Sequence, residues 1–88
     1  MIDLTKYDKA DVLAALYNHA KAQGMGLLHY TPEDMTREQA TIMLEHSSCF
    51  DYVHGRVMKV DLKGDTLDPR LYDRDNGEGA AERAIATI

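Results

Sequence analysis

Residues 51–62 hold the densest group of side chains that could bind an anion. Four of these side chains can donate hydrogen bonds to one: Tyr52, His54, Arg56 and Lys59. A guanidinium fork and an ammonium are groups with which proteins hold phosphate or carboxylate. Positions 56 and 59 have opposite parity, so a regular strand directs Arg56 and Lys59 to opposite faces. The two cations can therefore cooperate only if a turn or bulge at Gly55 interrupts the strand. Otherwise both are solvated surface charges.

A second group of polar residues lies where a predicted helix gives way to a predicted strand: Asn18, Gln23, Gly24 and Gly26. Neutral amides can read the edge of a base or a sugar, and glycines let a ligand approach the backbone closely. The alternative is an ordinary helix C-cap followed by a tightly packed strand. Together the two groups predict a ligand-binding site made of Asn18, Gln23, Gly24, Tyr52, His54, Arg56 and Lys59.

The histidines and carboxylates follow no recognisable metal-binding pattern. The spacings i, i+3 and i, i+4 of helical metal ligands do not occur among His19, His29, His46 and His54. The acidic residues 65–75 lack the alternating ligands of an EF-hand loop. Motifs for a catalytic nucleophile, a phosphate loop or a dinucleotide are missing as well, and Cys49 is read as a packing residue. We therefore predict no metal and no cofactor, and favour a non-enzymatic protein. A hydrolase or transferase with His29 or His54 as base is the open alternative.

Length and composition indicate one small α+β domain over residues 1–88. Hydrophobic residues make up 44% of the chain and charged residues 28%, as in ordinary globular proteins. A core this small is only marginally stable, so we expect a homo-oligomer. The net charge of −5 opposes binding to duplex nucleic acid, and the apolar runs are too short for a membrane span. The single cysteine indicates a reducing compartment, so we predict a cytoplasmic protein.

Local signals predict two helices. Asp8 is a suitable N-cap for a helix over about residues 8–22, with Lys21 in its last turn and Gly24 as terminator. Its apolar stripe would be Val12, Leu13, Leu16, Tyr17 and Ala20. A second helix is expected from Thr36 to near His46. Its first four residues form a capping box, with Met35 placed to pack on Ala40, and its buried face would add Met43 and Leu44.

The remaining elements are expected to be strands, a loop and a last helix. Residues 25–30 are short, apolar and bounded by turn signals, which predicts a strand. Residues 50–62 show the alternation of a half-buried strand. Within them, His54-Gly55 is either the turn of a hairpin, which we favour, or a bulge in one longer strand. Residues 64–77 predict a polar loop. Asn76 would cap a helix over about residues 78–87, with a buried side made of Ala81, Ala84, Ile85 and Ile88. The expected fold is a small two- or three-stranded sheet packed with about three helices, in the order α-β-α-β(β)-α.

Several segments together resemble a group of small uncharacterised proteins carried by bacteriophages and integrated mobile elements. The resemblance spans nearly the whole chain and is carried by residues 16–18, 23–26, 50–52, 55–62 and 71–77. It implies no established activity and no catalytic residues. It does imply a context, since short accessory phage proteins are often inhibitors that bind a host protein or a small signalling molecule.

Two functions follow from these patterns. The first is a non-enzymatic binding protein that sequesters a small anionic, nucleotide-like ligand between the end of the first helix and residues 52–59. A second subunit would complete that pocket. The alternative is an acidic inhibitor or adaptor that binds a host protein through its scattered carboxylates and the acidic stretch 65–78. Charge reversal of Asp73 and Asp75 would test the alternative.

Overall fold

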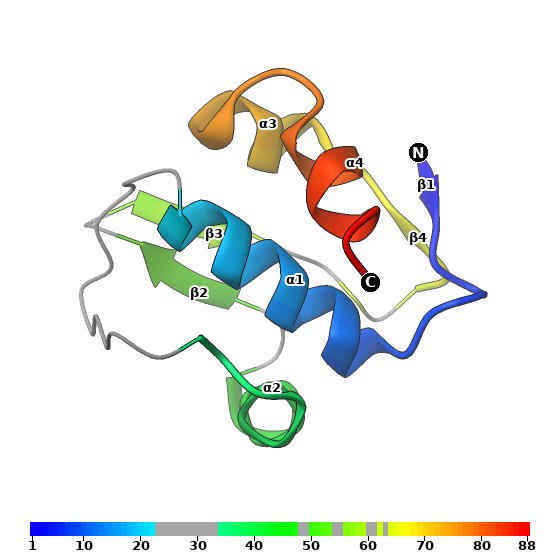
Figure 1. The fold of residues 1–88 in the computed structure, drawn as a ribbon, viewed down its shortest axis with the longest axis vertical. Coiled ribbons are helices and arrows are strands. Elements are labelled where there is room, and N and C mark those ends of the chain that lie inside the picture. Colours follow the sequence, from blue (N-terminus) through cyan, green and yellow to red (C-terminus); the bar gives the residue numbers. More distant parts are fainter. Residues whose placement is uncertain (23–33, 48–49, 54–55, 60–61, 63) are drawn as a thin grey trace.

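Figure 1 shows the fold in a computed structural model, which describes residues 1–22, 34–47, 50–53, 56–59, 62 and 64–88. For residues 46, 47, 50–53 and 56–59 the description covers the backbone alone. The described parts form a small α+β fold in which helices predominate, with four helices and two antiparallel strand pairs. In chain order the elements are β1 (Ile2–Asp3), α1 (Lys9–Ala22), α2 (Arg37–Ser47), β2 (Phe50–Val53), β3 (Arg56–Lys59), β4 (Thr66–Leu67), α3 (Arg70–Asn76) and α4 (Ala80–Ile85).

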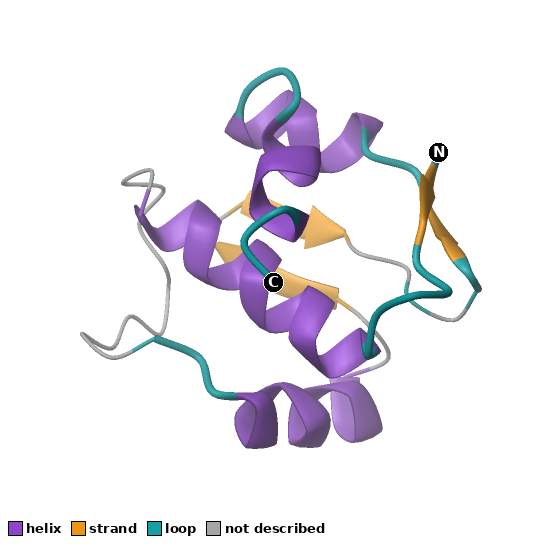
Figure 2. Cartoon of the chain, turned by 45° about the vertical axis from the view of Figure 1, so that its right-hand side comes forward, coloured by secondary structure: helices purple, strands orange, loops and turns teal. Residues whose placement is uncertain are grey.

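The helix α1 is central to the packing. It contacts α2 on one side and α4 on the other, while α3 lies against α4 and β3 (Figures 1 and 2). Most of the predicted stripe of α1 is buried, with Tyr17 half-buried beside Val12, Leu13, Leu16 and Ala20. The predicted N-cap is confirmed, because the Asp8 carboxylate accepts a hydrogen bond of 2.9 Å from the Ala10 amide. The predicted first helix thus forms the middle of the core.

The capping box of α2 is also confirmed. The Thr36 amide donates to the Gln39 side chain over 2.9 Å, and the Gln39 amide donates to the Thr36 hydroxyl over 3.2 Å. Met35 and Ala40 are both buried in the core cluster, as the predicted staple requires. Met43 and Leu44 are partly buried against the same cluster. Because these signals lie within one helical turn, the start of α2 can be recognised from the local sequence.

The strands β2 and β3 pair as a hairpin. They run antiparallel, with Val53 opposite Arg56 and Phe50 opposite Lys59. Residues 54 and 55 therefore stand between the two paired strands. The favoured prediction of a hairpin is confirmed, and the alternative of a bulge in one longer strand is wrong. Residues 54 and 55 themselves lie outside the described residues, and so does the predicted strand over residues 25–30.

The prediction of a polar loop over residues 64–77 is wrong, because this stretch contains β4 and α3. Leu67 in β4 is buried and pairs with Ile2 in β1, a strand that the sequence patterns do not predict. Tyr72 in α3 is 1% exposed, so this helix is held by its burial in the core. Asp68 supports the start of α3, since its carboxylate accepts a 3.1 Å hydrogen bond from the Arg70 amide.

The last helix differs from the prediction in its start, its cap and its buried face. It runs only from Ala80 to Ile85, and Asn76 is the last residue of α3 instead of its cap. The cap comes from Asp73, whose carboxylate accepts hydrogen bonds from the amides of Gly79 (3.2 Å) and Ala81 (3.0 Å). Between the two helices Gly77 and Gly79 have φ of 105° and 75°, a region that favours glycine. Ala80, Ala81, Ala84 and Ile85 are buried, whereas Ile88 is exposed.

Candidate functional site

The C-terminal end of α1 and the turn end of the β2–β3 hairpin lie on the same side of the molecule. Figure 1 shows both at the left, and Figure 2, turned by 45°, shows them there as well. β2 ends at Val53 and β3 begins at Arg56, so the turn end is the end that carries residues 54 and 55. The end of α1 and the turn end of the hairpin, where Arg56 begins β3, therefore face the same side, whereas Lys59 lies at the opposite end of β3, across from Phe50.

Asn18 is the predicted site residue whose side chain the structure describes. Its Nδ2 donates to the Met35 carbonyl over 3.1 Å, and its Oδ1 accepts from the Met35 amide over 2.8 Å. The side chain thus pairs with a whole peptide group in the segment that leads into α2. An amide has two N–H groups and two acceptor lone pairs, so Asn18 keeps one of each for another partner. Its main role in this structure is to fix the start of α2 on α1.

Lys21 lies one turn beyond Asn18 on the same face of α1, because residues three apart are neighbours on a helix. Its Nζ is 2.9 Å from Oδ1 of Asp34. The Lys21 side chain is only 11% exposed, whereas the Asp34 side chain is 74% exposed. The sequence pattern indicates Lys21 only as a cation in the last turn of the helix. Its spacing from Asn18 could have indicated a shared face, but nothing in the sequence indicates its burial or its partner.

The other predicted site residues are described in part or not at all. Gln23, Gly24 and His54 lie outside the described residues. For Tyr52, Arg56 and Lys59 the backbone is described, and the pairing of β2 with β3 is regular from end to end. Arg56 and Lys59 both follow the turn, on one strand, so their positions keep opposite parity. The break at residues 54 and 55 precedes both cations and does not bring them onto one face.

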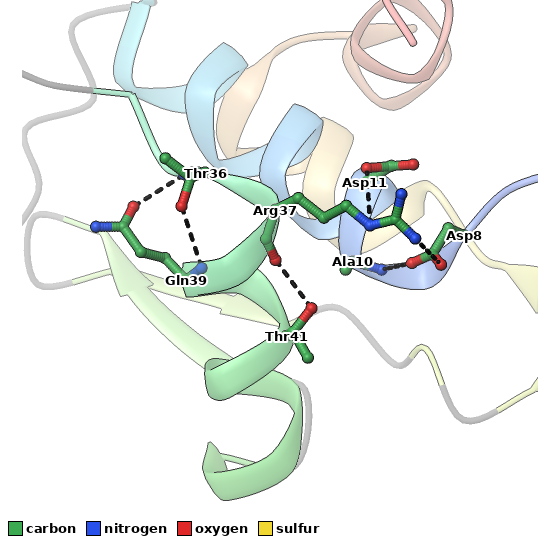
Figure 3. A network of polar contacts seen from close by, with 7 residues as sticks. All are labelled: Asp8, Ala10, Asp11, Thr36, Arg37, Gln39 and Thr41. Atoms are coloured by element: carbon green, nitrogen blue, oxygen red, sulfur yellow. Dashed lines mark hydrogen bonds and ion pairs between the residues drawn. The ribbon is translucent and has the colours of Figure 1, made fainter.

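A separate polar network joins the N-terminal ends of α1 and α2 (Figure 3). Arg37 Nη2 is 2.7 Å from Oδ2 of Asp8, and Arg37 Nε is 3.9 Å from Oδ1 of Asp11. Arg37 is the first residue of α2, where a cation is unfavourable for the helix dipole, and the two carboxylates offset this. Thr41 in the next turn donates to the Arg37 carbonyl over 2.9 Å. The two ion pairs of Arg37 join α1 to α2, and the Thr41 hydrogen bond lies within α2. These contacts account for the polar side chains at this place without a bound ligand.

The acidic residues between 65 and 78 are largely engaged in internal contacts. Hydrogen bonds from the side chain and then the backbone of Arg70 lower the pKa of Asp68 to about 2. The Asp73 carboxylate caps α4, as described above. Arg74 Nε is 3.6 Å from Oδ1 of Asp75. These three carboxylates therefore have partners within the chain, and Asp73 is structural.

In the described residues no group of three or more histidine, cysteine, aspartate and glutamate side chains could hold a metal ion. Within the same residues no helix is both long enough and apolar enough to cross a membrane. No protein-family model, curated protein or solved structure matches the chain.

Proposed function

We propose that this chain is a non-enzymatic binding protein that sequesters a small anionic, nucleotide-like ligand. The observation that carries the proposal is the common orientation of two elements. The C-terminal half of α1, with Asn18 and Lys21 on one face, ends on the same side as the turn of the β2–β3 hairpin. Amide and cationic groups are thereby brought to one side of a very small fold.

The dipole of α1 suggests which part of the ligand each of the two elements would bind. The C-terminal end of a helix carries partial negative charge, which favours cations and neutral groups and disfavours anions. The amides of Asn18 and Gln23 are suited to the base or sugar of a nucleotide. Of the two cations of the hairpin, Arg56 begins β3 next to the turn and is the one suited to the phosphate, whereas Lys59 lies at the opposite end of β3, across from Phe50.

The setting of this function is also a proposal. We propose a phage or mobile-element protein that acts in the cytoplasm, where its single cysteine would stay reduced. We also propose a homo-oligomer, since the second subunit would supply the other cation of the hairpin to a shared site. Oligomer formation adds buried surface to a core that is small for an independent domain.

A thermal-shift screen tests the proposal. The chain is melted with ribonucleoside monophosphates, diphosphates, triphosphates and cyclic nucleotides, and with neutral adenosine as control. A ligand that binds only the folded state raises stability, by about 2.7 kcal/mol at a hundred times its Kd. Arg56→Gln and Lys59→Gln should reduce the shift, whereas Arg74→Gln on α3 should leave it unchanged. A flat response to all nucleotides contradicts the proposal.

The alternative, an acidic inhibitor of a host protein, is less well supported by the described contacts. Asp73 is a helix cap and Asp75 faces Arg74, so the acidic stretch offers less free negative charge than the sequence suggests. Charge reversal at Asp73 would also destabilise α4 and cannot isolate a binding effect. A better test of the alternative reverses Glu38 and Glu45, which are exposed on α2.

A further inference from the structure

Two buried polar atoms have no hydrogen-bond partner among the side chains that the structure describes. They are Nε2 of His19, in the last turn of α1, and Oδ1 of Asn76, the last residue of α3. The Tyr72 hydroxyl, by contrast, is satisfied in the core by the Leu16 carbonyl. A buried polar atom that stays unpaired lowers stability, and a core this small has little stability to lose. Both atoms therefore need an explanation.

The two atoms belong to the C-terminal ends of helices that are in contact. The hydrogen bond of 2.7 Å from Tyr72 to Leu16 joins α3 to α1. From this contact, His19 lies about one turn further along α1 and Asn76 about one turn further along α3. Figures 1 and 2 show both helices running towards the side where the turn end of the β2–β3 hairpin lies. His19 and Asn76 are thus on the same side of the molecule as the start of β3.

We infer that His19 and Asn76 bind the base of the proposed nucleotide-like ligand. The inference rests on the proposed function and adds two hydrogen-bonding groups to its site. The C-terminal end of a helix disfavours anions, so a neutral base suits these residues better than a phosphate does. An amide oxygen only accepts hydrogen bonds, whereas a neutral imidazole nitrogen either donates or accepts. The base therefore offers an N–H donor to Asn76 and a second polar atom to His19.

The two side chains differ in how they would meet a base. Both residues are half-buried, so neither is locked into the core. Nε2 of His19 forms no hydrogen bond, and turning the imidazole towards a base breaks none made by that atom. The Asn76 amide is held by its Nδ2, which donates to the Tyr72 carbonyl over 3.0 Å and identifies Oδ1 as the acceptor. Because both atoms are shielded from solvent, we expect the two helix ends to open locally as the base enters.

A ligand without a base separates these contacts from the rest of the site. Ribose 5-phosphate carries the same phosphate as adenosine, cytidine, guanosine and uridine 5′-monophosphates. His19→Phe keeps a planar ring and removes both ring nitrogens. Calorimetry should show about three- to tenfold weaker binding of the monophosphate that the wild type binds best, which is the range of one hydrogen bond. Binding of ribose 5-phosphate should not change.

Two further variants complete the binding comparison. Asn76→Ala removes the other contact and should also weaken the nucleotide alone. Tyr7→Phe is the control, because Tyr7 is exposed and precedes the opposite end of α1, and it should affect neither ligand.

The melting temperature of the ligand-free chain distinguishes base recognition from a structural role. Because the buried Nε2 has no partner, an apolar ring of similar shape should leave the melting temperature unchanged or raise it. His19→Phe should therefore lose base recognition without losing stability. If His19→Phe loses helical signal in circular dichroism, Asn76→Ala carries the same comparison of nucleotide with ribose 5-phosphate.

The outcomes separate the two proposals. Equal nucleotide binding by the wild type, His19→Phe and Asn76→Ala would overturn the inference and leave the proposed function standing. An equal loss of binding for nucleotides and ribose 5-phosphate would do the same, because the residues would then not recognise the base. No binding of any nucleotide or of ribose 5-phosphate by the wild type would overturn both. A loss confined to nucleotides supports both.

Discussion

The hydroxyl of Tyr72 donates a hydrogen bond of 2.7 Å to the carbonyl oxygen of Leu16, and this bond joins α3 to α1 inside the core. Tyr72 is 1% exposed and Leu16 is 0% exposed. The polar tip of the tyrosine is therefore satisfied where water cannot reach it. Together with the burial of the Tyr72 ring, this contact anchors a helix in a stretch whose composition is that of a loop.

Removal of the Tyr72 hydroxyl should destabilise the protein. Tyr72→Phe keeps the ring and deletes the buried hydrogen bond, so we expect the free energy of unfolding to fall by about 1 kcal/mol. Urea denaturation followed by circular dichroism measures the change. Tyr7→Phe is the control, because Tyr7 is exposed and its substitution should change little. Equal effects of the two substitutions would mean that the Leu16 contact contributes nothing.

The same residue predicts a loss of stability at alkaline pH. Burial, and then the charge of Asp73, raises the pKa of Tyr72 above its usual 10.0. The folded state therefore keeps a proton that the unfolded state releases above pH 10.0, and stability falls as the pH rises beyond that point. Denaturation between pH 8 and 11 should show a steeper loss for the wild type than for Tyr72→Phe. Parallel pH profiles would contradict the assignment.

We expect Asn18 to contribute to the stability of the fold in the absence of any ligand. Asn18→Ala removes both hydrogen bonds to the Met35 peptide, and we expect a loss of about 2 kcal/mol in the free energy of unfolding. Asn18→Asp keeps an acceptor for the Met35 amide but sets a carboxylate against the Met35 carbonyl, so it should also destabilise. Urea titrations of these variants, with exposed Glu45→Ala as control, measure the effect. A loss no larger than that of the control would contradict the structural role.

The cap of α4 can be tested at Asp73. Asp73→Ala leaves the amides of Gly79 and Ala81 without their acceptor, so the free energy of unfolding should drop by about 1 kcal/mol. Asp65→Ala, at an exposed side chain in the same acidic stretch, should have little effect. Thermal melting compares the two. If the two variants melt together, the acidic residues act only through their net charge.

The Asp68–Arg70 pair predicts an unusual acid titration. Hydrogen bonds from Arg70 lower the pKa of the Asp68 carboxyl to about 2, from its ordinary 3.8. The stabilising effect is present above pH 3.8 and is lost as the pH falls towards 2. The carboxyl chemical shift in an NMR titration gives the midpoint directly. Arg70→Gln should return the midpoint towards 3.8, whereas Arg83→Gln should not change it.

Local sequence signals are sufficient to predict the elements that they specify within one or two helical turns. The Asp8 cap, the apolar stripe of α1 and the Thr36–Gln39 capping box are all local, and each is found as predicted. The hairpin was one of two readings of His54-Gly55, and the pairing of β2 with β3 decided between them. The prediction of the α+β class needed no more than these elements.

Tertiary structure decided everything that depends on residues far apart in the chain. The helix α3 exists where Tyr72 reaches Leu16, and β1 exists because Ile2 meets Leu67. Composition marked this stretch as a loop because local propensity does not report burial. The candidate site shows the same division. Its polar residue types are visible in the sequence, but their partners are not. That Asn18 is engaged by Met35, and Lys21 by Asp34, follows only from the packing of α2 on α1.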